Sequence, residues 1–170
     1  TALAAVGESV LVIDLDPQGN ASTGFGIEQE ERQGNIYHAL IGMLEIEETI
    51  IQTSIPGLSI ITSTVDLSGA ELELLEIENR EFRLKWLLEK CKQRFEYILI
   101  DCPPSLSVLT LNALVASDSV LIPLQCEFFA LEGLSHLLKT ISLVQKKLNA
   151  NLEIEGIVLT MYDTRNKLTT

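Results

Sequence analysis

Short apolar runs recur along the chain, and polar or turn-forming residues bound each of them. The runs are rich in β-branched residues and have the length of strands. Because their apolar residues are continuous rather than alternating, we expect both faces of the sheet to be covered, as in parallel α/β sheets. The predicted strands are residues 10–13, 58–61, 97–100, 119–122 and 154–159.

Between these runs, leucines recur at intervals of three and four residues, the spacing of one helix face. The predicted helices are residues 69–78, 81–92, 106–116 and 130–149, and Gly7 is expected to stop a further helix at the start. Strand and helix alternate, so the predicted fold class is α/β: a doubly wound, mostly parallel sheet with helices on both faces. No repeat or linker interrupts this pattern, and we expect residues 1–170 to form a single domain.

Composition narrows the class of protein. The formal net charge is −12, which by itself argues against a nucleic-acid-binding surface, because phosphate contacts need clustered lysines and arginines. Basic residues do gather in the last third of the chain, so the total charge does not describe every face. No apolar run reaches about 18 residues, so no segment is expected to span a bilayer, and no membrane is expected among the partners. The three cysteines are far apart and form no C-x-x-C pair, which favours a reducing cytoplasm.

Two of the predicted buried strands end in an aspartate, at Asp14 and at Asp101. Ligands of open α/β sheets bind at the carboxyl ends of the strands. A carboxylate there suits Mg²⁺, which prefers one or two carboxylates together with phosphates and water. Asp16 lies two residues beyond the first strand, where a carboxylate could orient a water for attack on a phosphoryl group. Either strand-terminal aspartate alone is equally well explained as the start of a turn, but the pair is harder to explain in that way.

The segments around these aspartates resemble a known family. Residues 11–21, LVIDLDPQGNA, look like a characteristic motif of the ParA/Soj family of deviant-Walker P-loop ATPases. Residues 97–105, YILIDCPPS, resemble the Walker B strand and following loop of that family. Residues 64–73, 117–133 and 156–165 are also similar to it, so the resemblance runs from end to end, and residues 28–60 are the least distinctive part.

The resemblance implies ATP and Mg²⁺ as cofactors and a role for each matching residue. Asp16 would be the catalytic aspartate that positions the attacking water, and Asp101 would hold Mg²⁺ through a water. Asp14 and Pro17 would lie in the vicinity of the nucleotide phosphates, with Asp14 in a supporting role. Arg165 resembles a position that contacts DNA in some members of the family, and an ordinary solvated loop arginine is an equal alternative.

The resemblance also implies partners. The expected protein forms an ATP-dependent homodimer, binds DNA non-specifically and segregates chromosomes or plasmids with a ParB-type partner, in the cytoplasm at the nucleoid. The glycine-rich K-G-G-V-G-K-T-T loop of the family is absent from this sequence. We therefore expect the 170 residues to be a piece cut at both ends, lacking that loop and the C-terminal part of the family, and to be inactive alone.

Two other functions stay open. The first is a MinD-like ATPase that places the cell-division site on the membrane, although the wording of both aspartate motifs favours the partitioning branch. The second is a non-hydrolysing interaction protein with a decayed site, against which the presence of Asp14, Asp16 and Asp101 argues.

Overall fold

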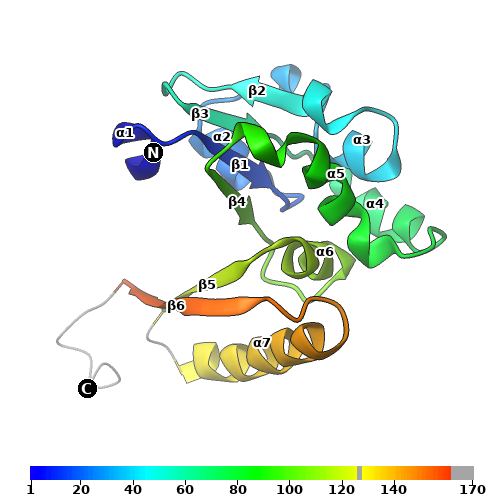
Figure 1. Ribbon diagram of the computed structural model, residues 1–170, viewed down its shortest axis with the longest axis vertical. Coiled ribbons are helices and arrows are strands. Elements are labelled where there is room, and N and C mark those ends of the chain that lie inside the picture. Colours follow the sequence, from blue (N-terminus) through cyan, green and yellow to red (C-terminus); the bar gives the residue numbers. More distant parts are fainter. Residues whose placement is uncertain (126–127, 162–170) are drawn as a thin grey trace. The chain divides into compact units, whose positions relative to one another are not determined.

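The computed structural model describes residues 1–125 and 128–161, and the chain divides into two compact units (Figure 1). The first unit is Thr1–Ala113 and the second begins at Leu114, inside helix α6. The elements of the first unit are α1 (Ala2–Ala5), β1 (Val10–Asp14), α2 (Asn20–Gly24), η1 (Gln29–Glu31), α3 (Ile36–Ile41), η2 (Ile46–Thr49), β2 (Ile50–Gln52), β3 (Leu58–Ile61), α4 (Leu67–Leu74), η3 (Arg80–Phe82), α5 (Arg83–Cys91), η4 (Lys92–Arg94) and β4 (Tyr97–Asp101). The chain continues with α6 (Val108–Ala116), β5 (Ser119–Gln125), α7 (Phe128–Lys147) and β6 (Glu153–Thr160).

The sheet of the first unit has the strand order β2-β3-β1-β4. Strand β1 is parallel to β3 and to β4, whereas β2 is antiparallel to β3. All residues of β1 and β3 are buried, as their continuous apolar sequence predicts. One face of the sheet packs Val10, Val12 and Ile60 against Leu3 and Ala4 of α1. The predicted α/β class with a mainly parallel sheet is thus confirmed.

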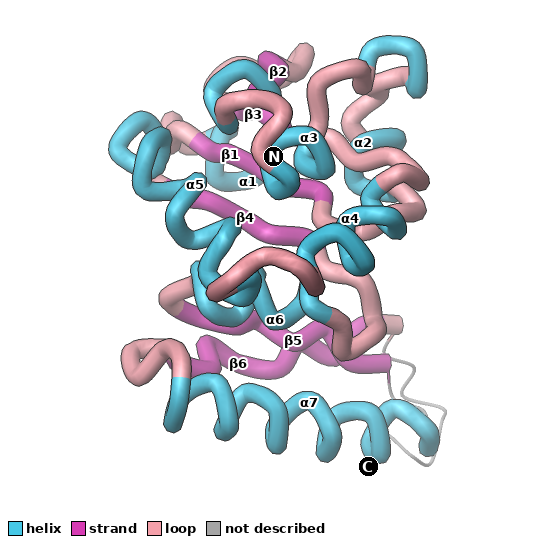
Figure 2. Tube along the Cα trace, turned by 90° about the vertical axis from the view of Figure 1, so that its right-hand side faces the viewer, coloured by secondary structure: helices cyan, strands magenta, loops and turns pink. Residues whose placement is uncertain are grey.

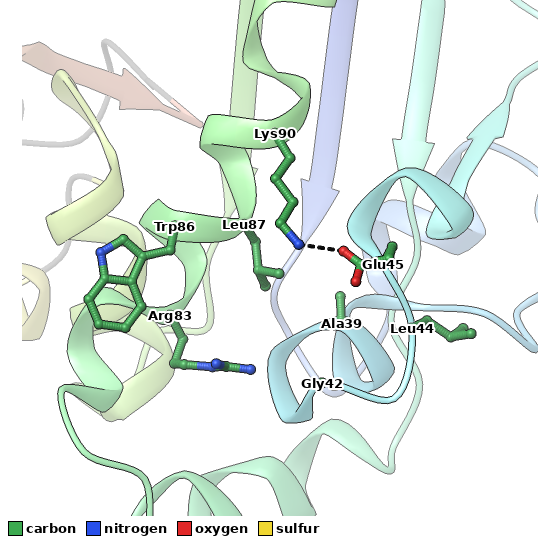
Figure 3. Close-up of a pocket in the computed structure, with 8 residues that line it drawn as sticks. All are labelled: Ala39, Gly42, Leu44, Glu45, Arg83, Trp86, Leu87 and Lys90. Atoms are coloured by element: carbon green, nitrogen blue, oxygen red, sulfur yellow. Dashed lines mark hydrogen bonds and ion pairs between the residues drawn. The ribbon is translucent and has the colours of Figure 1, made fainter.

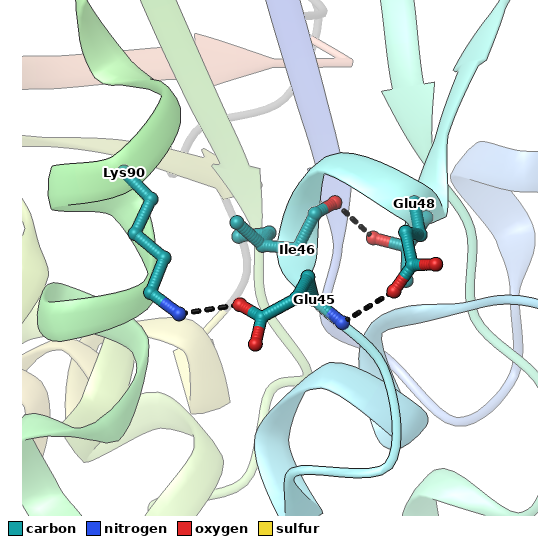
Figure 4. A network of polar contacts seen from close by, with 5 residues as sticks. Glu45, Ile46, Glu48 and Lys90 are labelled. Atoms are coloured by element: carbon teal, nitrogen blue, oxygen red, sulfur yellow. Dashed lines mark hydrogen bonds and ion pairs between the residues drawn. The ribbon is translucent and has the colours of Figure 1, made fainter.

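Local sequence explains where several helices begin and end. Helix α1 is followed by Gly7 in the left-handed region, at φ +100°, as its glycine predicts. Asn35 caps α3 by accepting a hydrogen bond from the Tyr37 backbone N–H. The short helix η2 begins with a capping box in which the backbone N–H of Glu45 donates to the Glu48 carboxylate, and Glu45 also pairs with Lys90 of α5 (Figure 4).

The second unit is built on two parallel strands, β5 and β6, with α7 running beside them (Figure 2). A register shift between Val120 and Leu121 interrupts the pairing. The side-chain amide of Asn149 donates to the backbone oxygens of Leu114, Val115 and Ser117, so it joins the end of α6 to the end of α7. None of the helices in the described ranges combines the length and apolar character needed to cross a bilayer.

The five predicted strands are present, and each of the predicted helices corresponds to an observed helix, from α4 to α7. Strand β2 and helix α2 lie where no element was predicted. Full burial holds for β1 and β3 but not for β4, whose residues alternate between exposed and partly buried. Within the sheet of the first unit, β4 is the outer strand and pairs with β1. That residues 1–170 form one domain stays a prediction.

Candidate functional site

The strand-terminal aspartates Asp14 and Asp101 lie directly opposite each other. They are the last register pair between the parallel strands β1 and β4, which run side by side in the first unit (Figure 1). The pairing of the two strands extends one residue further, because the backbone N–H of Leu15 donates to the backbone oxygen of Asp101 at 2.8 Å. The carboxyl ends of both strands therefore form one rim, and the segment containing Asp16 leaves the sheet there.

Asp14 is fully buried, and its carboxylate is occupied by donors of this chain. Its Oδ2 accepts hydrogen bonds from the backbone N–H and from the hydroxyl of Ser22, each at 2.7 Å. Its Oδ1 accepts a weaker bond from the Asp16 N–H at 3.3 Å. A buried carboxylate needs such partners, because leaving a charge unsatisfied in the interior is costly. Asp14 thus holds the loop that follows β1.

Asp16 sits at the turn of that loop. Its Oδ1 accepts a hydrogen bond from the backbone N–H of Gln18 at 2.9 Å, the side-chain-to-backbone pattern of an aspartate-initiated turn. The backbone N–H of Gly19 closes the turn by donating to the backbone oxygen of Asp16 at 2.9 Å. Pro17 lies between them and restricts the backbone. Gly19 has φ +65°, and a Cβ there would lie 2.6 Å from Arg32 Nη1, so the position requires glycine.

The electrostatics of the rim show that its carboxylates interact. Asp101 keeps an exposed surface, but partial desolvation of its carboxylate raises its pKa above the usual value, and the negative charges of Asp14 and Asp16 raise this pKa further. Burial also raises the pKa of the adjacent Cys102 thiol to about 12, with the charges of Asp101 and Asp16 contributing. Asp14 is paired with Asp101 across the two strands and accepts a hydrogen bond from the Asp16 N–H, so the structure brings the three residues predicted from the sequence to one rim.

A cation with its own phosphate and water ligands fits this rim better than a cage made of protein ligands. Among the described residues, no group of three or more histidine, cysteine, aspartate and glutamate side chains is arranged to hold a metal ion. Asp14 is already engaged with Ser22. Within the described residues, the Asp101 carboxylate accepts no hydrogen bond from a backbone N–H. Its charge is repelled by the carboxylates of Asp14 and Asp16, and a bound cation would relieve this repulsion. This donor set suits Mg²⁺, which is usually bound through one or two carboxylates and keeps several waters.

Three residues of the surrounding network were missed by the sequence analysis. The Ser22 hydroxyl, besides donating to Asp14, accepts a hydrogen bond from the Ser63 N–H at 3.1 Å, and the Ser63 oxygen accepts one from Arg32 Nη1 at 3.2 Å. Ser63 follows β3 at the same sheet edge, and this position was a usable signal. No pattern in the sequence points to Arg32. Arg165, the predicted DNA contact, lies outside the described residues.

A separate hollow lies between α5 and the segment that joins α3 to η2 (Figure 3). Arg83 lines this hollow, and its guanidinium donates to the Leu40 backbone oxygen from Nε at 3.1 Å and from Nη2 at 2.9 Å. None of the rim aspartates lines this hollow. Its lining residues are Ala39, Gly42, Leu44, Glu45, Arg83, Trp86, Leu87 and Lys90.

The sequence matches known proteins along nearly its whole length. A family model described as "AAA domain" matches residues 1–154. The chain is 53% identical to the chromosome partitioning protein ParA of Caulobacter vibrioides, with 99% of this chain and 64% of that protein covered. It is 52% identical to the sporulation initiation inhibitor protein Soj of Bacillus subtilis, with coverages of 98% and 66%. It thus spans a little less than two thirds of these relatives.

The fold matches as well. A crystal structure of cobyrinic acid a,c-diamide synthase from Mycobacterium smegmatis, solved with an ATP analogue and magnesium, superimposes with a TM-score of 0.93 at 39% identity. The match covers 99% of this chain and 68% of that one. The family model, the two relatives and this structure agree with the motifs at both strand ends. The chain therefore belongs to the AAA domain family and, within it, to the ParA/Soj type of P-loop proteins.

Proposed function

We propose that the protein is an ATP-hydrolysing partitioning protein. In this proposal it dimerises on ATP, binds DNA non-specifically and segregates chromosomes or plasmids with a ParB-type partner, at the nucleoid in the cytoplasm. The names of the two relatives that are 53% and 52% identical support partitioning over the amide synthesis named for the 39% identical structure. The bound ATP analogue and magnesium of that structure support the cofactors.

The observation that carries the proposal is the division of roles along the rim. The Asp14 carboxylate is hydrogen-bonded to Ser22 and stabilises the loop after β1. Asp16 lies at the turn of this loop. Asp101 faces the same region from the neighbouring strand. This arrangement separates a carboxylate that can orient a water from one that can hold a cation, the two functions that phosphoryl transfer requires of the protein.

In the proposed mechanism, Asp101 would hold Mg²⁺ through a water, and Asp16 would orient the water that attacks the terminal phosphate. The metal, when bound, neutralises charge on the phosphate oxygens. Catalysis then rests on positioning and charge, without a covalent intermediate. The 170 residues contain no G-K-[ST] loop, so we expect them to bind ATP weakly and to hydrolyse none on their own.

The test uses the complete gene product with ATP, Mg²⁺ and duplex DNA. Asp16→Asn should lower kcat by about a hundredfold or more, as loss of a positioned catalytic group does, while ATP binding changes little. Asp118→Asn is the control, because Asp118 is an exposed aspartate of the other unit and should leave turnover unchanged. Wild-type turnover in the Asp16→Asn protein would refute the proposed role, and an inactive wild type would refute the ATPase.

Arg165 is proposed as a DNA contact and needs a different measurement. Arg165→Ala should weaken DNA binding equally for unrelated sequences and reduce the salt dependence of the affinity by about one phosphate contact. ATP turnover without DNA is the control and should not change. A salt dependence equal to that of the wild type would reject Arg165 as a DNA contact.

A further inference from the structure

Arg32 is a buried cation with no carboxylate partner in the described part of the chain. It lies just after η1, and its residue is only 4% exposed. Burying a guanidinium is unfavourable unless hydrogen bonds satisfy its donors. The question is therefore what its donors hold.

The guanidinium of Arg32 contacts three separate segments. Nε and Nη2 donate to the Ile27 backbone oxygen at 3.1 and 2.6 Å, and Nη2 also donates to the Thr23 hydroxyl at 2.9 Å. Nη1 donates to the Ser63 oxygen at 3.2 Å and, more weakly, to the Gly19 oxygen at 3.5 Å. The planar fork of an arginine can reach such convergent oxygens, whereas the single nitrogen of a lysine cannot.

Two of these contacts lead directly to the candidate site. The backbone oxygen of Gly19 accepts a hydrogen bond from Arg32, and the Gly19 N–H donates to the backbone oxygen of Asp16. Gly19 alone therefore connects the guanidinium to the turn that carries Asp16. The Thr23 hydroxyl strengthens the link, because it donates to the same Gly19 oxygen at 3.0 Å. On the other side, Ser63 joins Arg32 to the Ser22 hydroxyl that Asp14 binds.

We propose that Arg32 is a positioning residue that fixes the turn carrying Asp16 by holding Gly19 and Ser63 together. This inference rests on the proposed ATP hydrolysis for its kinetic consequence. Arg32 acts through the backbone and not by touching the nucleotide, since its donors are already engaged with oxygens of this chain. This role agrees with the absence of a carboxylate partner for Arg32 in the described residues, because the groups that Arg32 holds are backbone oxygens.

The kinetic test compares Arg32→Gln, Arg32→Lys and Arg80→Gln in the complete gene product at saturating Mg²⁺. We expect Arg32→Gln to lower kcat on the order of ten- to a hundredfold, because small displacements of a catalytic group have effects of this size, with KM for ATP within about twofold of wild type. Arg32→Lys should not restore turnover. Arg80→Gln, which removes a hydrogen bond to the Leu75 oxygen away from the rim, should behave as wild type.

A second readout does not depend on activity. Hydrogen exchange of the Gly19, Ser22 and Ser63 amides should accelerate about tenfold or more in Arg32→Gln, while the strand amides of β1 keep their protection, because only local opening is affected. In Arg32→Ala, millimolar methylguanidinium should slow this exchange again and raise kcat toward wild type. An altered exchange pattern with an inactive wild type would reject the ATPase but support the role of Arg32 in holding Gly19 and Ser63 together.

Folded Arg32→Gln protein with wild-type kcat and wild-type amide exchange would overturn the inference. If Arg32→Gln does not fold, Thr23→Val decides the matter, because it removes the hydroxyl that joins Arg32 to Gly19 and leaves the arginine in place. It should lower kcat in the same direction by about threefold or more. A folded Thr23→Val protein with unchanged kcat and exchange would likewise overturn it.

Discussion

The carboxylate of Asp14 receives two hydrogen bonds at one oxygen from a single residue, Ser22, whose backbone N–H and hydroxyl each lie 2.7 Å from Oδ2. This pair joins the end of β1 to helix α2 and closes the loop that contains Asp16. The fully buried charge of Asp14 is thereby satisfied within the protein. The sequence motifs place Asp14 near the phosphates, but its contacts in the structure are those of a residue that stabilises the loop after β1.

Replacing Asp14 should therefore affect stability as well as activity. In Asp14→Asn an amide NH₂ must face either the Ser22 or the Asp16 donor, so one buried donor loses its acceptor. We expect the free energy of unfolding to fall by about 1–3 kcal/mol, the usual cost of an unsatisfied buried group. Ser22→Ala keeps the backbone N–H bond to Asp14 but leaves the buried Ser63 N–H without its acceptor, so it should lower the free energy of unfolding by a similar amount, about 1–3 kcal/mol. Urea unfolding measures both, and an unchanged midpoint for Asp14→Asn would contradict the structure.

Thr62 offers a test with the opposite sign. Its fully buried hydroxyl oxygen is the one side-chain polar atom of the described residues that is buried without a hydrogen-bond partner. Thr62→Val keeps the shape and removes the orphaned group, so the free energy of unfolding should stay the same or rise by up to about 1 kcal/mol.

Thr49→Val is the matched control for Thr62→Val. Thr49 is equally buried, but its hydroxyl donates to the Ile46 oxygen at 2.8 Å. Losing this bond should lower the free energy of unfolding by about 1 kcal/mol. Equal destabilisation by the two valine substitutions would mean that the Thr62 hydroxyl does have a partner.

The sequence predicts the sheet strands well because their signal is local. A continuous apolar run such as residues 10–13 identifies a covered strand wherever it occurs, and two such strands ending in aspartate meet at one edge if they are parallel. Asp14 and Asp101 could therefore be placed together before the structure was known. The three-residue antiparallel strand β2 has no comparable pattern and was missed.

The contacts around the site are harder to predict, because they join segments that are distant in sequence. Ser63 reaches Ser22 across 41 residues and Arg32 across 31. Nothing in the local pattern of Arg32, which follows several glutamates, distinguishes it from a solvated surface residue. Its burial results from the meeting of three loops, and only the fold shows which oxygens they present.

Cys102 should be an unreactive thiol in the folded protein. Burial, with the charges of Asp101 and Asp16, raises its pKa to about 12, and its Sγ lies 3.7 Å from the Ile100 oxygen. At pH 8 the reactive thiolate is then about one part in ten thousand, so iodoacetamide should modify it far more slowly than in urea. Peptide mapping by mass spectrometry measures this, and equal rates in the folded and unfolded states would contradict it.

A substitution of Asp101 should separate stability from activity. Its pKa is raised above the usual 3.8, first by burial and then by Asp14 and Asp16, so folding disfavours its charged form. The favourable contribution is complete below the unfolded-state pKa and is lost as the pH rises through the raised, folded-state pKa. At neutral pH the ionised carboxylate therefore destabilises the fold, and a neutral side chain in its place should not.

Asp101→Asn should accordingly raise the unfolding midpoint at pH 7 while abolishing ATP turnover in the complete gene product. The gain in midpoint should shrink as the pH falls toward about 4, because the wild-type carboxyl then becomes neutral in the folded state as well. Thermal and urea unfolding between pH 8 and pH 4 follow this change, with Asp118→Asn as a control substitution of an exposed aspartate in the other unit. A less stable Asp101→Asn protein at pH 7, or a gain independent of pH, would mean that the rim carboxylates do not repel one another. A stabilised but inactive variant is the result expected of a charge kept at a functional site at the expense of the fold.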